Sequence, residues 1–414
     1  MHTYDVSRSQ ALYARAQEVI PGGIFGHYGY SVRPDGPKFF SRAEGAHFWD
    51  LDGNEYIDYM CAYGPMILGY RHPAIEAAVS AEQRHGNTVS LAAPIMVELA
   101  ETLVETVAAA DWALFGKNGG DATGLAVMVA RAATGRAKIV KVEGGYHGVA
   151  PWMREGFPGA IPADLEQVLK VPWNDAGAFE QLISAYPGEI ACFISSPYHH
   201  PVFADNELPA PGYWARMEAL CRANGIVLIV DDVRSGFRLH RAGSNVAYGF
   251  TPDLVCFGKA IGNGHPLAAL VGTDALKDAA KDVYFTGTQF FNAAPMAAAK
   301  ATLDELGKID AVGKMTDLGT ELSDGLVKVA GQRGYELIAS GIPAMPYYRL
   351  ANVSRHIHFA WIDECVKRGV YLLGYHNHFL SIAHTEADLQ RTWEVADAAF
   401  EALGEPEQAQ AAAG

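Results

Sequence analysis

The chain has 414 residues, of which half are hydrophobic and 19% are charged, so it is long enough for a large domain and a smaller one around a substantial core. Its formal net charge of −15 argues against nucleic acid or an anionic membrane surface as a partner, because both are negatively charged. No stretch has the length and apolar character of a transmembrane helix or a signal peptide, so no membrane association is expected.

The cysteines and histidines indicate neither a disulfide framework nor a metal site. Five cysteines are spread singly along the chain without a CxxC pair, which is typical of reduced thiols and of a cytoplasmic protein. His199 and His200 are adjacent, but no third and fourth ligand stand at metal-site spacing. We therefore expect a cytoplasmic protein without a metal.

The N-terminal part of the chain contains a helical pattern and a hairpin pattern. The amphipathic helical pattern covers residues 9–20 and stops at the Pro-Gly-Gly sequence of residues 21–23. An aromatic loop with interspersed glycines follows at residues 24–30. Residues 39–59 then alternate like two strands around an Asp-Gly dipeptide at residues 52–53, which favours a hairpin turn.

From residue 72 onward, helix-length amphipathic segments alternate with short apolar runs. The expected helices cover residues 73–85, 95–108, 122–133, 176–185 and 212–223. The expected strands cover residues 112–115, 139–142, 190–194, 226–230, 254–257 and 268–271. This alternation predicts an α/β protein with a predominantly parallel sheet that is covered by helices.

The pattern changes after about residue 298. A long helical pattern continues to about residue 329, followed by short strands and a last helix at about residues 386–403. This order is typical of a smaller α+β domain. We therefore expect four segments: an N-terminal segment that contributes to the small domain (1–65), a large domain (66–297), a C-terminal small domain (298–404) and a frayed tail (405–414).

Two predicted strands end in residues that suit one kind of chemistry. Asp231 directly follows the strand at 226–230, and Lys259 follows the strand at 254–257, so both lie where ligands bind in open α/β sheets. A lysine can form a Schiff base with an aldehyde cofactor, and an aspartate can keep a pyridine nitrogen protonated. The protonated pyridine ring withdraws electrons from the carbon that is being deprotonated. The lysine amine, once freed from the cofactor, can then carry the proton that this carbon loses.

The loop GKNGGDAT, at residues 116–123, lies between a predicted strand and a predicted helix. Its exposed amides could hold a phosphate through Asn118, Gly119 and Gly120, and Asp121 can cap the helix that follows. An ordinary strand-to-helix turn would have the same composition.

Two further positions could contact a cofactor. Tyr146 follows the strand at 139–142 and could stack on a planar ring, and Gly148 allows close backbone approach. Thr288 follows a glycine turn and could give its hydroxyl to a phosphate. Simple packing and a turn hydrogen bond are the alternatives for these two side chains.

Taken in this order, the motifs resemble a known family. The matching segments are VIPGG, FWDLDGNEYIDY, GYRHP, KNGGDAT, ARAATGR, EGGYHG, LIVDDVRSGFR, GKAIGNGHP and SIAHT, and the similarity runs from about residue 11 to residue 400. The chain resembles the class III, fold-type I aminotransferases that depend on pyridoxal 5′-phosphate (PLP), and within them the glutamate-1-semialdehyde 2,1-aminomutase-like group. The resemblance implies a large, mostly parallel, seven-stranded-type sheet domain with a small α+β domain from both chain ends, in homodimers with active sites at the interface.

The resemblance also implies roles for individual residues. Lys259 forms the Schiff base with PLP, Asp231 pairs with the pyridine nitrogen, Tyr146 lies over the ring, and Thr288 reaches the phosphate of the neighbouring subunit. The other cofactor-binding positions implied are Asn118, Gly119, Gly120, His147 and Val233.

The chain departs from the aminomutase pattern at three places, one of which is the Asp-Glu pair after the central strand, replaced here by Asp231 and Asp232. An arginine that usually follows the Pro-Gly-Gly turn is replaced by Gly29, and the nearby Arg33 is out of register. A glutamate often found before the SIAHT-like motif is replaced by about His376. These changes favour an aromatic pocket that binds an apolar or amine substrate. The expected substrate-binding residues are Tyr28, Tyr30, Tyr63 and His376, and His27 could form a further part of the pocket wall.

The expected function is a PLP-dependent aminotransferase that moves an amino group from an amine or non-standard amino acid to a 2-oxo acid or another carbonyl acceptor. The cofactor would alternate with pyridoxamine 5′-phosphate over two half-reactions. An isomerase of the same fold, either a 2,1-aminomutase or a racemase, is the first alternative. A non-enzymatic PLP-binding protein is the second, and the presence of both Lys259 and Asp231 argues against it.

Overall fold

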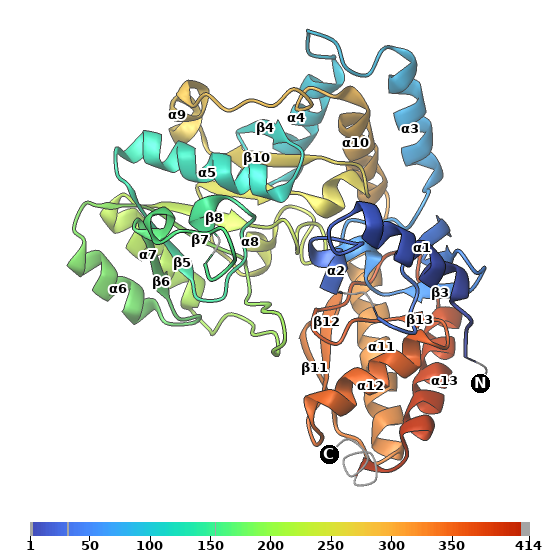
Figure 1. Ribbon diagram of the computed structural model, residues 1–414. Helices are drawn as coiled ribbons and strands as arrows, with labels where there is room; N and C mark the ends of the chain where they lie inside the picture. The colour runs from blue at the N-terminus through green and yellow to red at the C-terminus, as the bar shows by residue number, and fades with distance from the viewer. Residues whose placement is uncertain (1–2, 31–32, 154, 407–414) are drawn as a thin grey trace. The chain divides into compact units, whose positions relative to one another are not determined.

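The protein forms two compact units in a computed structural model that describes residues 3–30, 33–153 and 155–406 (Figure 1). The larger unit consists of Pro73–Pro201 and Glu207–Val312. The smaller unit consists of Met1–His72, Val202–Asn206 and Gly313–Gly414. The tail expected at residues 405–414 lies outside the described residues from 407 onward.

The larger unit is built on a seven-stranded sheet in the order β4-β10-β9-β8-β7-β5-β6. Only β10 is antiparallel to its neighbours, so the predicted mostly parallel sheet is confirmed. The six predicted strands are present, with ends that shift by one residue at most. The strands are β4 Trp112–Gly116, β5 Lys138–Val142, β6 Val168–Val171, β7 Ile190–Ser195, β8 Val227–Asp231, β9 Leu254–Phe257 and β10 Ala268–Gly272.

β6, which lies at the edge of this sheet, was not predicted from the sequence. Most of its residues are only partly buried, and it contains Lys170. A half-exposed edge strand therefore lacks the continuous apolar run that revealed β7 and β8, whose residues are buried throughout.

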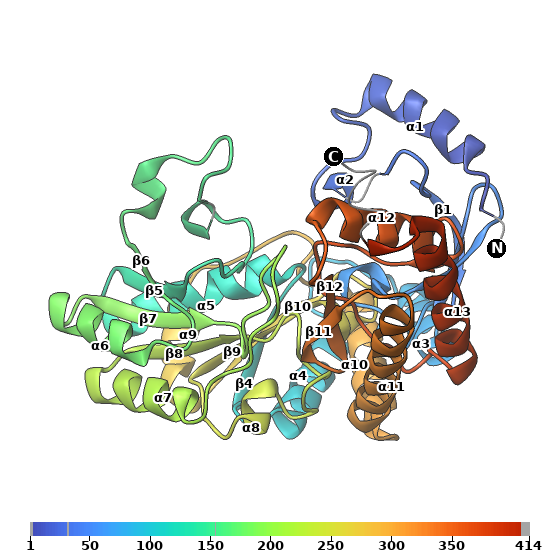
Figure 2. The same ribbon diagram turned by 90° about the horizontal axis from the view of Figure 1, so that it is seen from below.

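All five helices predicted for this part of the chain are present, and α5 packs on the middle of the sheet. The helix α5 begins at Gly119 rather than at residue 122, so Gly119 and Gly120 form its first turn. The helices α6 and α7 lie side by side (Figure 2). The helices are α3 Pro73–Arg84, α4 Ile95–Thr106, α5 Gly119–Thr134, α6 Ala176–Ala185, α7 Tyr213–Asn224, α8 Ser244–Ala247, α9 Lys277–Asp282 and α10 Ala293–Gly307, with 3-10 helices η2 Pro151–Met153, η3 Pro162–Leu165, η4 Lys259–Gly262 and η5 Asp274–Leu276.

The smaller unit joins both ends of the chain in one sheet, because β13 pairs in parallel with β3 of the predicted N-terminal hairpin. A separate hairpin of β11 and β12 is antiparallel, and α12 packs against α13. The strands are β1 Phe40–Glu44, β2 His47–Asp50, β3 Glu55–Asp58, β11 Leu337–Ile342, β12 Met345–Leu350 and β13 Val370–Tyr371. The helices are α1 Ser7–Val19, α2 His27–Tyr30, α11 Ala311–Gln332, α12 Arg355–Val366 and α13 Glu386–Leu403, with the 3-10 helix η1 Cys61–Tyr63.

The unit boundaries differ from the sequence-based division at both ends of the large domain. Residues 66–72 belong to the smaller unit. Residues 298–312 belong to the larger unit, because α10 packs against α3 and α4. The single helical pattern expected up to residue 329 is in fact two helices, α10 and α11.

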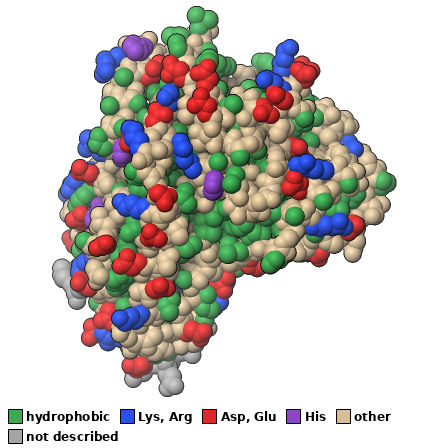
Figure 3. All heavy atoms as spheres, turned by 180° about the vertical axis from the view of Figure 1, so that it is seen from behind, with side chains coloured by type: hydrophobic (Ala, Val, Ile, Leu, Met, Phe, Trp, Pro, Cys, Tyr) green, Lys and Arg blue, Asp and Glu red, His purple; other side chains and the backbone are tan. Residues whose placement is uncertain are grey.

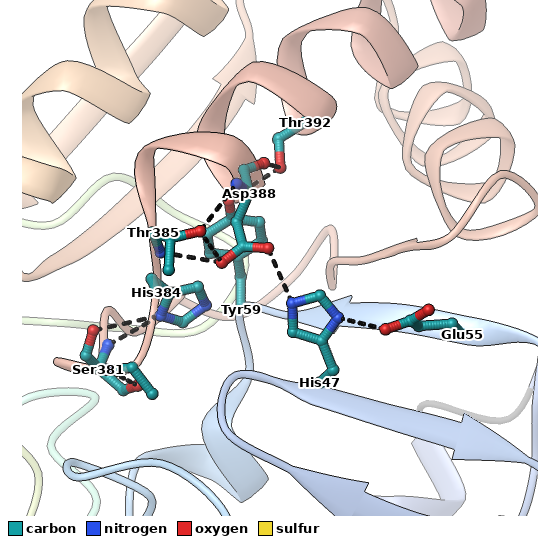
Figure 4. A network of polar contacts seen from close by, with 9 residues as sticks. His47, Glu55, Tyr59, Ser381, His384, Thr385, Asp388 and Thr392 are labelled. Atoms are coloured by element: carbon teal, nitrogen blue, oxygen red, sulfur yellow. Dashed lines mark hydrogen bonds and ion pairs between the residues drawn. The ribbon is translucent and has the colours of Figure 1, made fainter.

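A polar network ties the N-terminal hairpin to the last helix within the smaller unit (Figure 4). His47 on β2 contacts Glu55 Oε1 through Nδ1 at 2.9 Å and Asp388 Oδ1 through Nε2 at 2.8 Å. Asp388 lies in the first turn of α13 and also accepts from the N–H and hydroxyl of Thr385. Because both ring nitrogens face carboxylates, the hydrogen bond to Asp388 above all raises the pKa of His47.

Among the described residues, no helix combines the length and the apolar character that a membrane span requires. On the face shown in Figure 3, acidic and basic side chains are interspersed. With a net charge of −15, the protein as a whole repels polyanions.

Candidate active site

Four strand-end loops meet at one edge of the larger sheet. β4 and β9 run in the same direction because each is antiparallel to β10, and β5, β7 and β8 continue in parallel with β9. The loops after β4, β5, β8 and β9 therefore leave the sheet at the same edge, where ligands bind in open α/β sheets.

Glycines allow these loops to approach closely. A Cβ on Gly119 would lie 2.6 Å from Cγ1 of Val233, so the loop after β4 touches the turn after β8. A Cβ on Gly148, whose φ is +112°, would lie 2.7 Å from the Cα of Gly120, so the loop after β5 touches α5. Any larger residue at Gly119 or Gly148 would force the loops apart.

Asp231 is the last residue of β8, and its carboxylate is held from two sides. Its Oδ2 lies 2.7 Å from Nδ1 of His147, and its Oδ1 accepts the N–H of Val233 at 3.2 Å. Both Asp231, at 6% exposure, and His147, at 3%, are buried. The side chain is therefore fixed in orientation by residues of its own unit.

Lys259 is the first residue of η4 and has a φ of +45°, a left-handed conformation that is unfavourable for a residue with a side chain. Removal from water, followed by the positive charge of Arg234, lowers the pKa of Lys259 to about 7. Asp231 opposes this shift, and Arg238 adds to it. The amine is therefore partly neutral near pH 7 and can act as a nucleophile or a proton acceptor.

The start of α5 offers an anion site. Asp121 caps this helix as expected, but from inside its first turn: its Oδ2 accepts the N–H groups of Lys117 and of the N-cap residue Asn118, each at 2.8 Å. The amides of Gly119 and Gly120 stand at the positive end of the helix dipole. Nζ of Lys117 is buried and has no hydrogen-bond partner among the described residues, and burial lowers the pKa of Lys117 to about 8.

Tyr146 and Thr288 occupy different surroundings. Tyr146 is 62% exposed on the loop after β5, and this loop is anchored by Thr123, whose hydroxyl donates to the carbonyl of His147 at 2.6 Å. Thr288 lies on an exposed turn between α9 and α10, outside the four strand-end loops. The structure thus gathers at one sheet edge the expected residues Asn118, Gly119, Gly120, Tyr146, His147, Asp231, Val233 and Lys259, but not Thr288.

The aromatic residues expected to bind substrate gather within the smaller unit. The rings of Tyr28, His27 and His376 pack edge-on around Tyr63, with centroids 5.4, 4.6 and 5.3 Å from it. The hydroxyl of Tyr63 lies 3.1 Å from that of Tyr375. The side chain of Tyr30 lies outside what the structure describes. We name the five residues His27, Tyr28, Tyr63, Tyr375 and His376 the aromatic cluster.

The backbone that carries Tyr63 is strained. Cys61, Ala62 and Tyr63 have φ values of +46°, +54° and +66°, three successive left-handed residues with side chains. Such conformations are found where the surrounding structure holds a residue in place, often at functional sites. The turn fixes the direction of the Tyr63 ring.

Arg33 is not available to bind a substrate carboxylate. Its guanidinium forms an ion pair with Asp363 on α12. Burial lowers the pKa of Arg33. Arg33 is the arginine nearest to Gly29, which replaces the carboxylate-binding arginine of the aminomutase-like group. The charge of Arg33 is therefore already paired with a carboxylate of the protein itself.

The side chains at the sheet edge match the chemistry of PLP. Lys259 provides an amine for an aldehyde, Asp231 a carboxylate for a pyridine nitrogen, and Tyr146 an exposed ring for stacking. The amides at the start of α5 and the unpartnered buried Nζ of Lys117 suit a phosphate. Fold and site together define a PLP-dependent transferase of fold type I.

The chain belongs to the class-III aminotransferases, whose family profile matches residues 30–386. It is 42% identical to the aminopentol aminotransferase of Sphingopyxis macrogoltabida over 96% of this chain and 94% of the relative. It is 33% identical to the 3-aminobutyryl-CoA aminotransferase of Cloacimonas acidaminovorans (strain Evry) over 94% and 95%. The solved structure of the PLP internal aldimine form of the Sphingopyxis sp. MTA144 FumI protein matches with a TM-score of 0.93 at 42% identity, over 96% of both chains. The protein is thus a PLP-dependent aminotransferase.

No role in the site was predicted from the sequence for Lys117, Arg234 or Tyr375, and His200 was considered there mainly as half of a metal pair. Arg234 could have been noticed, because a charged residue in the turn directly after a wholly apolar strand needs a buried partner. Lys117 lies inside the loop at residues 116–123, of which only Asn118, Gly119 and Gly120 were expected to hold a phosphate. No local signal marks Tyr375, because its partner Tyr63 lies 312 positions away.

Proposed function

We propose that this aminotransferase takes its amino group from a donor without a free carboxylate beside the amine, and passes it to a 2-oxo acid or another carbonyl acceptor. The ion pair of Arg33 with Asp363 carries this proposal, because it occupies the arginine nearest to the carboxylate-binding position of the aminomutases that the chain resembles. Two relatives support it: one is named for an aminopentol and the other for 3-aminobutyryl-CoA, a thioester.

Bound PLP supplies an aldehyde that takes up the amino group and a ring that draws electrons from the adjoining carbon. We propose that Lys259 holds the cofactor through its amine between turnovers and afterwards moves the proton at the reacting carbon. Its pKa of about 7 supports this role, because a neutral amine can accept a proton. Asp231 would keep the pyridine nitrogen protonated.

The other residues would hold and orient the cofactor. His147 and Val233 would fix Asp231, and Tyr146 would stack on the ring. The phosphate would bind at the start of α5, through Asn118, Gly119 and Gly120. Lys117 would add a positive charge there, because its buried Nζ has no hydrogen-bond partner among the described residues.

The aromatic cluster would contact the donor. Tyr28, Tyr63 and His376 supply apolar surface, and the paired hydroxyls of Tyr63 and Tyr375 supply hydrogen bonds. This combination would suit an amine on a chain that carries hydroxyl groups. We keep Tyr30 in the proposed set because it adjoins Tyr28 in sequence.

We further propose a cytoplasmic homodimer. All five cysteines are buried free thiols, which suits a reducing compartment. Thr288 lies on an exposed turn, and in a homodimer it would reach the cofactor phosphate of the neighbouring copy. Sedimentation equilibrium would test the assembly, and a monomer at micromolar concentration would contradict it.

The test of the proposed function is a half-reaction of PLP-loaded protein with single donors and no acceptor. The panel contains alkylamines, amino polyols, 3-aminoacyl thioesters and ordinary α-amino acids. We expect loss of the visible cofactor band and release of one equivalent of carbonyl product with the first three classes, and much slower loss with α-amino acids. Faster loss with α-amino acids would overturn the proposed donor class.

Two other outcomes would change the assigned reaction itself. A rearranged or inverted amine without lasting loss of the band would identify an isomerase. No reaction with any donor would leave a protein that only binds the cofactor.

A further inference from the structure

Arg234 and Lys259 leave the sheet side by side. In the parallel pair β8 and β9, Asp231 is in register with Cys256. Arg234 comes three residues after Asp231, and Lys259 comes three residues after Cys256. The two cationic side chains therefore start from matching positions on adjacent turns at the candidate active site.

The guanidinium of Arg234 is anchored on the side away from β9. Its Nη1 lies 3.0 Å from Nδ1 of His200 and donates to the carbonyl oxygen of His200 at 3.2 Å. His200 follows β7, the neighbour of β8 on the other side, and packs edge-on against the ring of Tyr198 at 5.2 Å. Arginine can only donate, so Nδ1 of His200 accepts this hydrogen bond.

Among the described residues, charges of both signs act on this pair. Arg234 and Arg238 place positive charge near Lys259, whereas Asp231 places negative charge near both Lys259 and Arg234. The hydroxyls of Tyr146 and Tyr198 also face Arg234. Among these charges, that of Arg234 is the strongest influence on the Lys259 amine, and it disfavours protonation because like charges repel.

We propose that Arg234, anchored by His200, is a positioning residue that keeps a fixed positive charge beside Lys259 and so sets how readily the lysine nitrogen takes up a proton. The inference rests on the proposed bond between Lys259 and the cofactor. Because the charge is fixed by His200, its effect is the same before and after a donor arrives. Arg234 would then tune the proton transfer without touching the donor.

The experiment is a spectral pH titration of PLP-loaded protein, in which the visible band reports protonation of the lysine nitrogen bonded to the cofactor. Removing a like charge makes protonation easier, so Arg234→Gln should raise the midpoint by about one pH unit. Arg234→Lys keeps the charge and should restore most of the wild-type midpoint. Arg216→Gln, which removes an exposed arginine paired with Glu180 on α6, is the matched control and should leave the midpoint unchanged.

If Arg234→Gln folds poorly or binds little PLP, the variant His200→Ala tests the same inference through the same pH midpoint. Without its anchor, Arg234 can turn toward water, and the midpoint should rise in the same direction by a smaller amount. Cofactor stoichiometry and circular dichroism identify variants that are properly folded. Loaded Arg234→Gln or His200→Ala protein with a wild-type midpoint would overturn the inference.

Failure of the inference can be told apart from failure of the proposed function. If the band of Lys259→Ala protein keeps the wild-type pH midpoint, the proposed bond between lysine and cofactor is wrong, and both proposals fall together. If the band depends on Lys259 but its pH midpoint is the same in the Arg234 and His200 variants as in the wild type, only the inference about Arg234 is wrong. The half-reaction with donors is independent of both results.

Discussion

Nδ1 of His147 lies 2.7 Å from Oδ2 of Asp231, and both side chains are buried. The two residues are 84 positions apart: His147 follows β5, Asp231 is the last residue of β8, and β7 lies between these strands in the sheet. Since Oδ1 accepts the N–H of Val233, both carboxylate oxygens are engaged. The orientation of Asp231 is thus set before any cofactor binds, which reduces the cost of binding.

Replacing His147 should therefore weaken the cofactor site without unfolding the protein. We expect His147→Ala to loosen Asp231 and to weaken PLP binding about 10- to 100-fold, the effect of losing a hydrogen bond to a buried charged group. Equilibrium dialysis with PLP measures the loss. His147→Asn retains a donor and should recover part of the affinity; equal losses in both variants would show that bulk, and not the hydrogen bond, matters.

Lys117 should make phosphate binding depend on pH. Burial lowers the pKa of Lys117 to about 8, so its amine is protonated below this pH and neutral above it. We expect the affinity for pyridoxamine 5′-phosphate, which cannot bond to Lys259, to fall as the pH rises through about 8. Lys117→Met should bind about tenfold more weakly at pH 7, the loss of one charge-assisted hydrogen bond.

Isothermal titration calorimetry between pH 7 and pH 9.5 measures both effects. In Lys117→Met the decline through pH 8 should be absent. A decline of the same size in this variant would assign the pH dependence to another group.

The paired hydroxyls of the aromatic cluster should affect donors and spare the cofactor. We expect Tyr63→Phe to lower kcat/KM for hydroxylated amines by about 5- to 10-fold, because one hydrogen bond is worth about 1 kcal/mol. The absorption spectrum of the loaded protein should stay unchanged. In Tyr375→Phe the loss should be similar, and in the double variant it should be less than the product of the two. Losses that multiply fully would mean that the two hydroxyls act independently.

His47 should make the stability of the smaller unit depend on pH. Its pKa is raised in the folded state by the hydrogen bond to Asp388, so its contribution is fully present below pH 6.5 and is lost as the pH rises through the raised value. We expect His47→Ala to lower the free energy of unfolding by about 1–2 kcal/mol at pH 6 and by less at pH 9. Urea unfolding at both pH values tests this.

His356 provides the matched control for that measurement. It is an exposed histidine on α12, so His356→Ala should cost the same small amount at both pH values. If the cost of His47→Ala proves equal at pH 6 and pH 9, His47 is not protonated between its two carboxylates.

Six of the seven strands of the larger sheet could be predicted from local sequence, all except the edge strand β6. Apolar runs such as those of β7 and β8 specify strands buried on both faces, and their regular alternation with amphipathic helices specifies a parallel sheet. The candidate residues Asp231 and Lys259 could be found for the same reason, since the ends of such strands meet at one edge. The family could also be predicted from the sequence, because the motifs occur in the order that is typical of the class III aminotransferases.

What the sequence could not determine are contacts between residues far apart in the chain. The pairing of His147 with Asp231, of Arg234 with His200 and of Tyr63 with Tyr375 depends on strand order and loop conformation. The short segment Val202–Asn206 interrupts the larger unit in sequence but belongs to the smaller unit, and this too depends on strand order and loop conformation. Periodicity records only which face of an element is buried. Which side chains meet across those faces is decided by packing of the whole chain, because the free energy of each such contact is gained only when both partners are already in place.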